Sequence, residues 1–255
     1  MHNLTRKFLP FSSVLLFAIS MAWTPATAAA QSASFAISQH GKSVGTASFS
    51  LTSSGNGYNS TSVLHVSMQG LEYALSKTER LNSAHHLRNA HLSATINGQA
   101  VTVAAEPASS QPASSRTATQ IQLTTSANGR KSSTSLALHS GAVFLPDFDP
   151  GALETLLSLA ASRNNRDLWA ILPKKTGLIE SIVLATYADQ KGTLDGKPVE
   201  VHHLVATIGN STIDLFSNAA NQLLQAEYSQ QGFALVRKGF VLTPSSKPQA
   251  STQAQ

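Results

Sequence analysis

Residues 92–103 read LSATINGQAVTV, a stretch in which apolar and polar residues alternate on both sides of a two-residue turn. Alternation with a period of two is typical of a strand that buries one face. Asn97-Gly98 is a strong hairpin signal, because both turn positions take a positive φ that asparagine and glycine tolerate best. The stretch therefore predicts two antiparallel strands joined by a tight turn.

The same arrangement recurs along most of the chain. Asn128-Gly129 and Asp195-Gly196 also join alternating segments and predict two more hairpins. Other alternating segments are expected to be strands, at residues 35–37, 47–51, 64–68, 71–81, 179–187, 199–208, 212–216, 223–228 and 233–241. Helices are not expected between successive strands. The pattern excludes a doubly wound parallel sheet and predicts a mainly β (α+β) fold, a curved antiparallel sheet forming a half-barrel or open barrel.

One segment in the middle of the chain breaks the β pattern. Asp149 can cap a helix, and Pro150 suits the first helical position, where a missing N–H costs nothing. The apolar residues that follow have helical spacing and share one face: Leu153, Leu156, Leu157, Ala160 and Ala161. We expect this one main helix to end at Asn164-Asn165 and to pack on the concave side of the sheet.

The first 30 residues have the order of a secretory signal peptide. Arg6 and Lys7 precede an apolar stretch at residues 8–23, and Ala28-Ala29-Ala30 offers a small-residue cleavage site. The apolar stretch is too short and too rich in serine for a membrane anchor, which needs about 20 apolar residues. We therefore expect cleavage near Ala30 and a mature form without a transmembrane anchor.

Composition bounds the compartment and the domain organisation. The chain has no cysteine, which excludes disulfides, and cysteine-free export is typical of bacteria, so we expect a periplasmic or secreted bacterial protein. A hydrophobic fraction of 42% with 12% charged residues indicates a globular chain. We expect a single β-rich domain at residues 31–242. It contains a flexible loop rich in serine and proline at 106–117, and a disordered tail follows at 243–255.

The positive charge of the chain does not indicate nucleic-acid binding. The formal net charge is +5, and removing Arg6 and Lys7 with the signal peptide leaves 5 − 2 = +3. The remaining lysines and arginines are scattered, whereas a nucleic-acid-binding protein usually clusters them on one face. We expect no nucleic-acid partner.

The nine histidines raise the question of a metal site. His85-His86 and His202-His203 are adjacent pairs, and neighbours in a strand point to opposite faces, so each pair offers one ligand per face. Zinc needs three or four converging ligands. We expect no metal ligands, with the histidines facing solvent. The sequence contains no G-x-S-x-G, P-loop or dinucleotide-binding motif, and we expect neither catalytic residues nor a cofactor.

Charged residues elsewhere allow more than one interpretation. Asp147 and Asp149 could supply a pair of carboxyl groups for acid–base chemistry, but capping and complementing the helix dipole accounts for both more simply. Lys77-Thr78-Glu79-Arg80 alternates in charge and is interpreted as a solvated strand face.

The order of motifs resembles that of a known group of proteins. Gly41 and Val44-Gly45 open the chain, and later segments read GKPVEV at 196–201, IDLF at 213–216, LLQAE at 223–227 and GFALVR at 232–237. In this order the chain resembles an uncharacterised group of bacterial periplasmic proteins whose half-barrel is similar to the lipoprotein carriers LolA and LolB. The resemblance implies a curved sheet wrapped around a helix, with an apolar cavity.

The leading hypothesis is a non-enzymatic exported protein that binds a hydrophobic ligand, a lipid or acyl chain, in the half-barrel. The candidates for lining its cavity are Leu153, Leu156, Leu157, Trp169 and Phe216, although Trp169 also suits a plain core. Two alternatives stay open. One is an envelope interaction or chaperone-like protein without a small ligand, whose partner is an envelope protein. The other is an enzyme that modifies envelope polymers.

Overall fold

The computed structural model describes residues 30–108, 120–175 and 178–244. The expected signal peptide, most of the expected loop at 106–117 and most of the expected tail lie outside these residues. The N-terminal half consists of long strands: β1 (Gln31–Gln39), β2 (Lys42–Ser54), β3 (Gly57–Met68), β4 (Leu71–Asn82), β5 (Leu87–Ile96), β6 (Gln99–Pro107), β7 (Gln120–Ala127) and β8 (Arg130–Ala137).

The C-terminal half begins with the short strand β9 (Ala142–Phe144) and the helix α1 (Pro150–Ser162). Further strands and two 3-10 turns follow: β10 (Leu168–Leu172), η1 (Pro173–Lys175), β11 (Leu178–Thr186), β12 (Gln190–Leu194), β13 (Lys197–Ile208), β14 (Ser211–Ser217), β15 (Leu223–Tyr228), η2 (Ser229–Gln231), β16 (Phe233–Arg237) and β17 (Phe240–Leu242).

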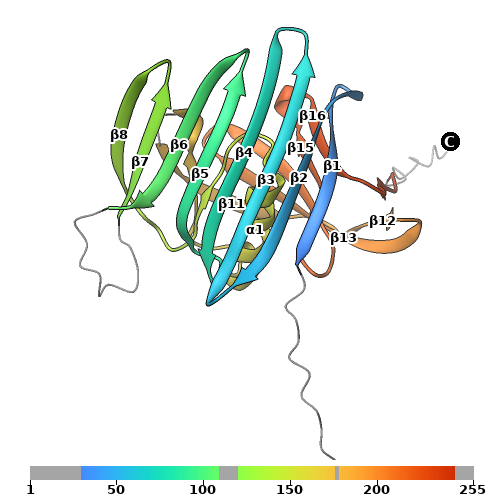
Figure 1. Ribbon diagram of the computed structural model, residues 1–255. Coiled ribbons are helices and arrows are strands. Elements are labelled where there is room, and N and C mark those ends of the chain that lie inside the picture. The colour runs from blue at the N-terminus through green and yellow to red at the C-terminus, as the bar shows by residue number, and fades with distance from the viewer. Residues whose placement is uncertain (1–29, 109–119, 176–177, 245–255) are drawn as a thin grey trace, which may run out of the picture.

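The strands form one curved sheet (Figure 1). Antiparallel pairing joins β1 to β8 in chain order, and β16 pairs with β1, so a late strand closes onto the first. The sheet continues from β16 through β15, β14, β13 and β11 to β10. β9 pairs with β10 in parallel, while the other described pairings are antiparallel. The expected curved antiparallel sheet is confirmed.

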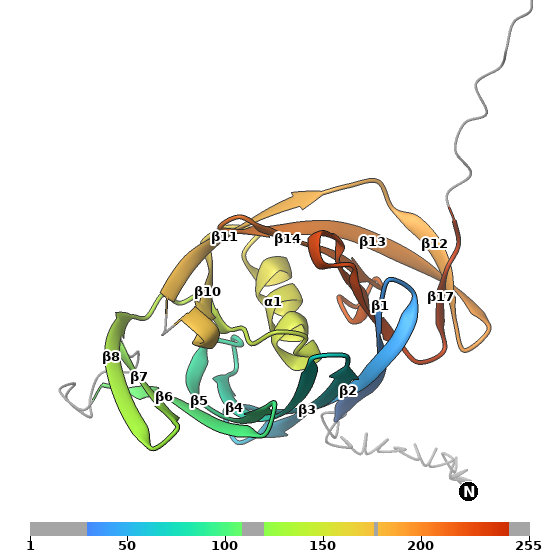
Figure 2. The same ribbon diagram turned by 90° about the horizontal axis from the view of Figure 1, so that it is seen from above.

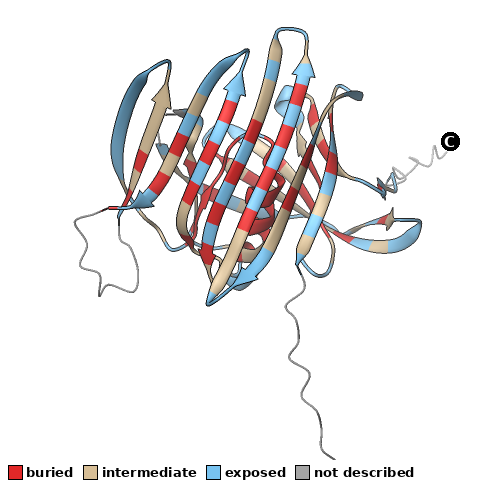
Figure 3. Ribbon diagram, in the orientation of Figure 1, coloured by how far each residue is buried: buried red, intermediate tan, exposed pale blue. Residues whose placement is uncertain are grey.

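Figure 2 shows from above how the sheet curls around α1, which lies inside it. Along β3, β4 and β5 buried and exposed residues alternate, and the banding is visible in Figure 3. In β3, for example, Leu64 and Val66 are buried on the inner face while Val63 and His65 are exposed on the outer face. The alternation expected from the sequence is therefore the alternation between the inside and the outside of the half-barrel.

Local signals in the sequence placed the turns correctly. Asn97 and Gly98 have φ of 49° and 80°, as the turn between β5 and β6 requires. In the turns Asn128-Gly129 and Asp195-Gly196, both residues likewise have a positive φ. These three predicted hairpins are confirmed.

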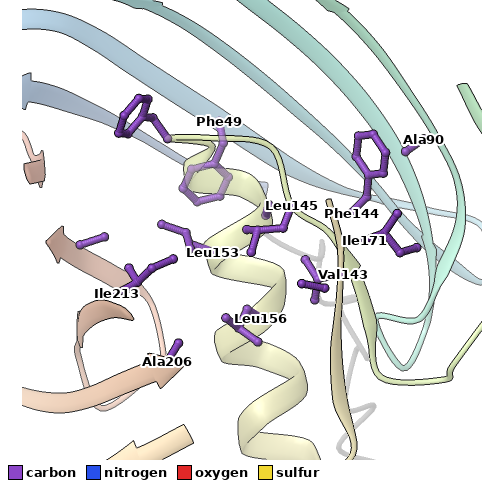
Figure 4. Close-up of a cluster of buried hydrophobic side chains, with 14 of the residues drawn as sticks. Phe49, Ala90, Val143, Phe144, Leu145, Leu153, Leu156, Ile171, Ala206 and Ile213 are labelled. Atoms are coloured by element: carbon purple, nitrogen blue, oxygen red, sulfur yellow. The ribbon is translucent and has the colours of Figure 1, made fainter. Parts of the chain in front are cut away.

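The helix begins where the sequence predicts. Asp149 caps it, with Oδ1 accepting from the backbone N–H of Gly151 at 2.9 Å and of Ala152 at 3.2 Å. Leu153 and Leu156 lie in the main hydrophobic core between the helix and the sheet (Figure 4). The expected single apolar face understates the burial, because polar Glu154 and Thr155 are buried as well. The sheet surrounds the helix, so the helix is enclosed and not laid on one surface.

Candidate functional site

Two cavities open on either side of the loop that joins β9 to α1. The first, about 390 Å³, lies against the inner face of β4, β5 and β6, and its walls include Leu71, Leu92, Ala94, Ile96, Val101 and Val103. The second, about 440 Å³, lies toward β13 and β14, and its walls include Leu145, Leu172, Ile208, Thr212, Ile213 and Tyr228. Both volumes fall in the range of small-molecule sites, and both walls are mainly apolar.

The same short loop forms a wall of both cavities. Pro146, Asp147 and Phe148 line each of them, together with Lys174 from η1 and Gln231 from η2. The loop is held at its start by a backbone hydrogen bond of 2.9 Å from Leu145 N–H to Ile171 C=O. It is held at its end by the Asp149 cap, which makes the loop a partition between two apolar spaces.

Phe148 is the partition's main side chain. It has φ of 58°, an uncommon backbone conformation for a bulky residue. Its ring packs against Tyr228, with centroids 5.2 Å apart, and against Phe233, with centroids 4.7 Å apart. These contacts to β15 and β16 offset the backbone strain, and they keep an aromatic ring between the cavities.

Two partly buried phenols lie beside this partition. Tyr73 lines the first cavity and Tyr228 lines the second. Burial, helped by the charges of Asp147 and Asp149, raises the pKa of both hydroxyl groups above the ordinary tyrosine value. Both therefore stay neutral at physiological pH, so each wall gains a polar but uncharged group.

One exposed ion pair lines both cavities, and we call its position their shared mouth. Lys174 Nζ lies 2.8 Å from Asp147 Oδ2, and the two side chains are 79% and 47% exposed. Exposure of this degree means that water competes for both charges, so the pair is weak. Among the described residues that line the two cavities, Asp147 and Lys174 are the charged ones.

A second ionic cluster is buried on the other side of Phe148. Lys77 Nζ lies 2.6 Å from Asp149 Oδ2 and 3.2 Å from Glu79 Oε2, and all three side chains are inaccessible to solvent. Burial alone lowers the pKa of Lys77, but the charges of Asp149 and Glu79 outweigh it and hold the pKa above its ordinary value. Burial raises the pKa of Glu79 above its ordinary value despite the neighbouring lysine.

The cluster ties the start of α1 to the sheet. Lys77 and Glu79 pair in register with Ser62 and Ser60 on β3, and the helix start lies directly over these serines. A Cβ atom at Gly151 would clash with the Ser62 hydroxyl, so glycine is needed for this close approach. Because solvent does not reach these side chains, we assign the cluster to structure and not to contact with a ligand.

The opposite wall of the sheet holds the helix through Glu154. Its Oε2 accepts from the backbone N–H of Leu223 at 2.8 Å, and its Oε1 accepts from the side-chain amide of Gln31. Burial raises the pKa of Glu154 above its ordinary value, against these hydrogen bonds. One helix is thus joined by polar contacts to β4, to β15 and to β1.

The structure places the five predicted cavity residues apart from the two cavities. Leu153, Leu156 and Leu157 are buried in the main core, and Trp169 stacks on His139 with centroids 3.9 Å apart. Phe216 belongs to a smaller cluster with Val201, Leu224 and Phe240. The walls of the two cavities consist of other residues, so a role of these five in ligand contact stays a prediction.

One interpretation of the charged residues is wrong. Lys77 and Glu79 do not face solvent, because they alternate with Thr78 and Arg80 and so share the inner face with Leu75 and Leu81. The period of two in this strand contained the signal that could have placed them inside. Asp149 caps the helix as expected, whereas Asp147 pairs with Lys174 and does not cap.

The histidines make separate contacts. His202 Nδ1 lies 3.0 Å from Asp189, while His203 Nε2 lies 2.9 Å from Asp214 and its ring stacks on Phe216. His85 stacks on Tyr58. Within residues 30–108, 120–175 and 178–244, no three histidine, aspartate or glutamate side chains converge as metal ligands.

Comparisons with known proteins support the fold. No family model and no curated protein matches the sequence. Among solved structures, the chain is similar to a β-barrel-like protein of the domain of unknown function DUF1849 from Brucella abortus. The TM-score is 0.52 and the identity 9%, over 84% of this chain and 97% of the other. At this identity the similarity shows the fold alone.

None of the described helices combines the length and apolar character that a membrane span requires.

Proposed function

We propose that the protein is an exported, non-enzymatic binding protein that holds a hydrophobic ligand, a lipid or an acyl chain, inside its half-barrel. The observation that carries the proposal is the pair of apolar cavities, about 390 and 440 Å³, that meet at the loop Pro146–Phe148. Cavities of this size and lining favour apolar molecules, because moving apolar surface out of water is the main source of their affinity.

The order of motifs supports the same proposal, since it resembles that of periplasmic proteins whose half-barrel is similar to the LolA and LolB carriers, and this resemblance implies an apolar cavity. Export follows from the signal-peptide pattern, with cleavage near Ala30 and residence in a bacterial periplasm or outside the cell. Catalysis is not proposed, because the ionisable groups nearest the cavities are a neutral phenol pair and an exposed ion pair.

The test is uptake of a neutral apolar dye, N-phenylnaphthylamine, by the mature protein, followed by displacement with palmitate. Saturable uptake that palmitate reverses supports the proposal. A double variant, Val101→Trp with Thr212→Trp, fills both cavities and should lose the dye, because these residues line the first and the second cavity respectively.

The matched control is Val183→Trp, which adds the same ring at a position that is 63% exposed and should bind the dye like the wild type. If the wild-type protein takes up no dye, or if the double variant binds it unchanged, the cavities do not hold apolar ligands. The envelope interaction protein would then become the better interpretation.

A further inference from the structure

The two cavities have one mouth between them, and this geometry restricts the shape of the ligand. Each cavity has its own apolar end, one against β4–β6 and one against β13 and β14. Phe148 lies in the wall that both cavities share, and Asp147 and Lys174 also line both. A molecule with one apolar chain would fill one cavity and leave the other to water. A molecule with two chains joined at a polar group would fill both at once.

We propose that the ligand is a two-chain zwitterionic amphiphile of the glycerophospholipid class. One acyl chain lies in each cavity, and the head group lies at the shared mouth, with its phosphate on Lys174 and its ammonium on Asp147. This inference rests on the proposed function, and it adds the number of chains and the charge of the head group.

The ion pair at the mouth provides the charge complementarity. Lys174 and Asp147 pair with each other at 2.8 Å, and both are well exposed, so separating them costs little. A zwitterionic head group offers an anion to Lys174 and a cation to Asp147, so both protein charges keep a partner after exchange. The hydrogen bonds that form are charge-assisted and take the place of the pair they break.

Other head groups fit less well. A fatty acid or an anionic phospholipid would pair with Lys174 but would leave Asp147 without its cation and next to a like charge. An uncharged lipid would meet a mouth whose two charges already satisfy each other. Charge pairing therefore favours a zwitterion over both alternatives.

The number of chains is tested with the two cavity-filling variants taken singly. Wild type, Val101→Trp and Thr212→Trp are each incubated with phosphatidylcholine vesicles, separated by sedimentation, and assayed for bound phosphorus per protein chain. The wild type should bind one lipid, and each variant should lose roughly tenfold or more in affinity. Lysophosphatidylcholine, which has one chain, should still bind to both variants, because each keeps one cavity open.

The head group is tested by comparing phosphatidylcholine with phosphatidylglycerol vesicles of the same acyl chains. Lys174→Gln should weaken phosphatidylcholine binding by roughly tenfold, since it removes the phosphate partner. Asp147→Asn should reduce the preference for phosphatidylcholine and strengthen phosphatidylglycerol binding. The charge-swapped double variant, Asp147→Lys with Lys174→Asp, keeps both charges at the mouth and should bind phosphatidylcholine better than either single variant.

Val183→Trp and the thermal unfolding midpoint of each variant serve as controls for folding. If single-chain lipids bind and phosphatidylcholine does not, the two-chain inference is overturned while the proposed function stands. If phosphatidylglycerol binds as tightly as phosphatidylcholine, or Lys174→Gln has no effect, the head-group assignment is overturned. If neither lipids nor the apolar dye bind, the proposed function fails together with this inference.

Discussion

Asp147 and Asp149 are two residues apart, yet one side chain forms an exposed ion pair and the other a buried one. Asp147 faces the cavity mouth and pairs with Lys174 in water, while Asp149 faces the interior and pairs with Lys77 out of contact with solvent. Phe148 lies between them with a positive φ, and this turn of the backbone sends the two carboxylates in opposite directions.

The difference distinguishes an anchoring side of the loop from a side whose charges can change partners. The Asp149 side anchors the loop, because a buried charge that loses its partner is costly. The Asp147 side stays available, because an exposed pair is exchanged at little cost. The loop is therefore held in place by Asp149, while the exposed charges at the mouth can change partners. This arrangement suits the binding site proposed above.

The largest expected effect on stability comes from replacing Asp149, the buried one of the two aspartates. Asp149→Ala should lower the free energy of unfolding by about 3–5 kcal/mol, because it leaves Lys77 buried without its nearest carboxylate and removes the helix cap. Asp147→Ala should cost at most about 1 kcal/mol. Urea unfolding of both variants makes the comparison. Equal losses would show that burial does not separate the two aspartates.

The next effect concerns the ring that divides the cavities. Phe148→Ala should cost about 3 kcal/mol, since it removes a buried ring that packs on Tyr228 and Phe233. The variant should also take up more of the apolar dye, because the two cavities merge. Unfolding and dye titration on the same preparation test both effects. An unchanged dye capacity would mean that Phe148 is not the partition.

A smaller effect is expected in the pH dependence of stability. Burial raises the pKa of Glu79 above its ordinary value of 4.5, so the folded protein holds a proton that the unfolded chain releases. The stability contributed by that proton is complete below pH 4.5 and is lost as the pH rises through the folded-state pKa.

Glu79→Gln should remove this dependence, so the stability of the wild type relative to the variant should fall as the pH rises from 4.5 toward neutrality. Thermal unfolding across that range measures the difference. The exposed Glu200→Gln variant reports the general effect of losing a carboxylate. A wild-type advantage that grows with pH would contradict the assignment.

The smallest effect on stability is expected at the mouth. Lys174→Gln should change the free energy of unfolding by less than about 1 kcal/mol, because its ion pair is exposed. The same variant should change lipid preference, so stability and recognition separate at this residue. A large destabilisation would indicate that the mouth pair holds the fold together, and the contrast with Asp149 would then be lost.

The two aspartates also illustrate which features of this structure can be predicted from its sequence and which cannot. The hairpins and the helix start were predictable, because Asn97-Gly98 and Asp149-Pro150 act through their own backbone conformations. Lys77 and Glu79 were misplaced because their charge was given more weight than their alternation with Leu75 and Leu81. Asp147 was interpreted with Asp149 as capping or complementing the helix dipole, because nothing in its neighbourhood points to Lys174, 27 residues away.

An apolar cavity was expected from the resemblance, but the residues that form the walls of the two cavities were beyond prediction from the sequence. Their walls come from residues as far apart as Leu71 and Phe233, which meet only when β16 closes on β1 and the sheet curls. A helix with apolar residues pointed to a covered concave face, but not to the place where the packing leaves space. Local patterns specify strands and caps, whereas a cavity depends on the long-range course of the sheet.

Native mass spectrometry of the protein, purified without detergent from the cells that produce it, detects a bound lipid without an added probe. We expect a species heavier than the apo chain by the mass of one two-chain phospholipid, which solvent extraction releases and which the Val101→Trp/Thr212→Trp variant lacks. A clean apo mass for the wild type, together with no uptake of the apolar dye, would contradict this expectation.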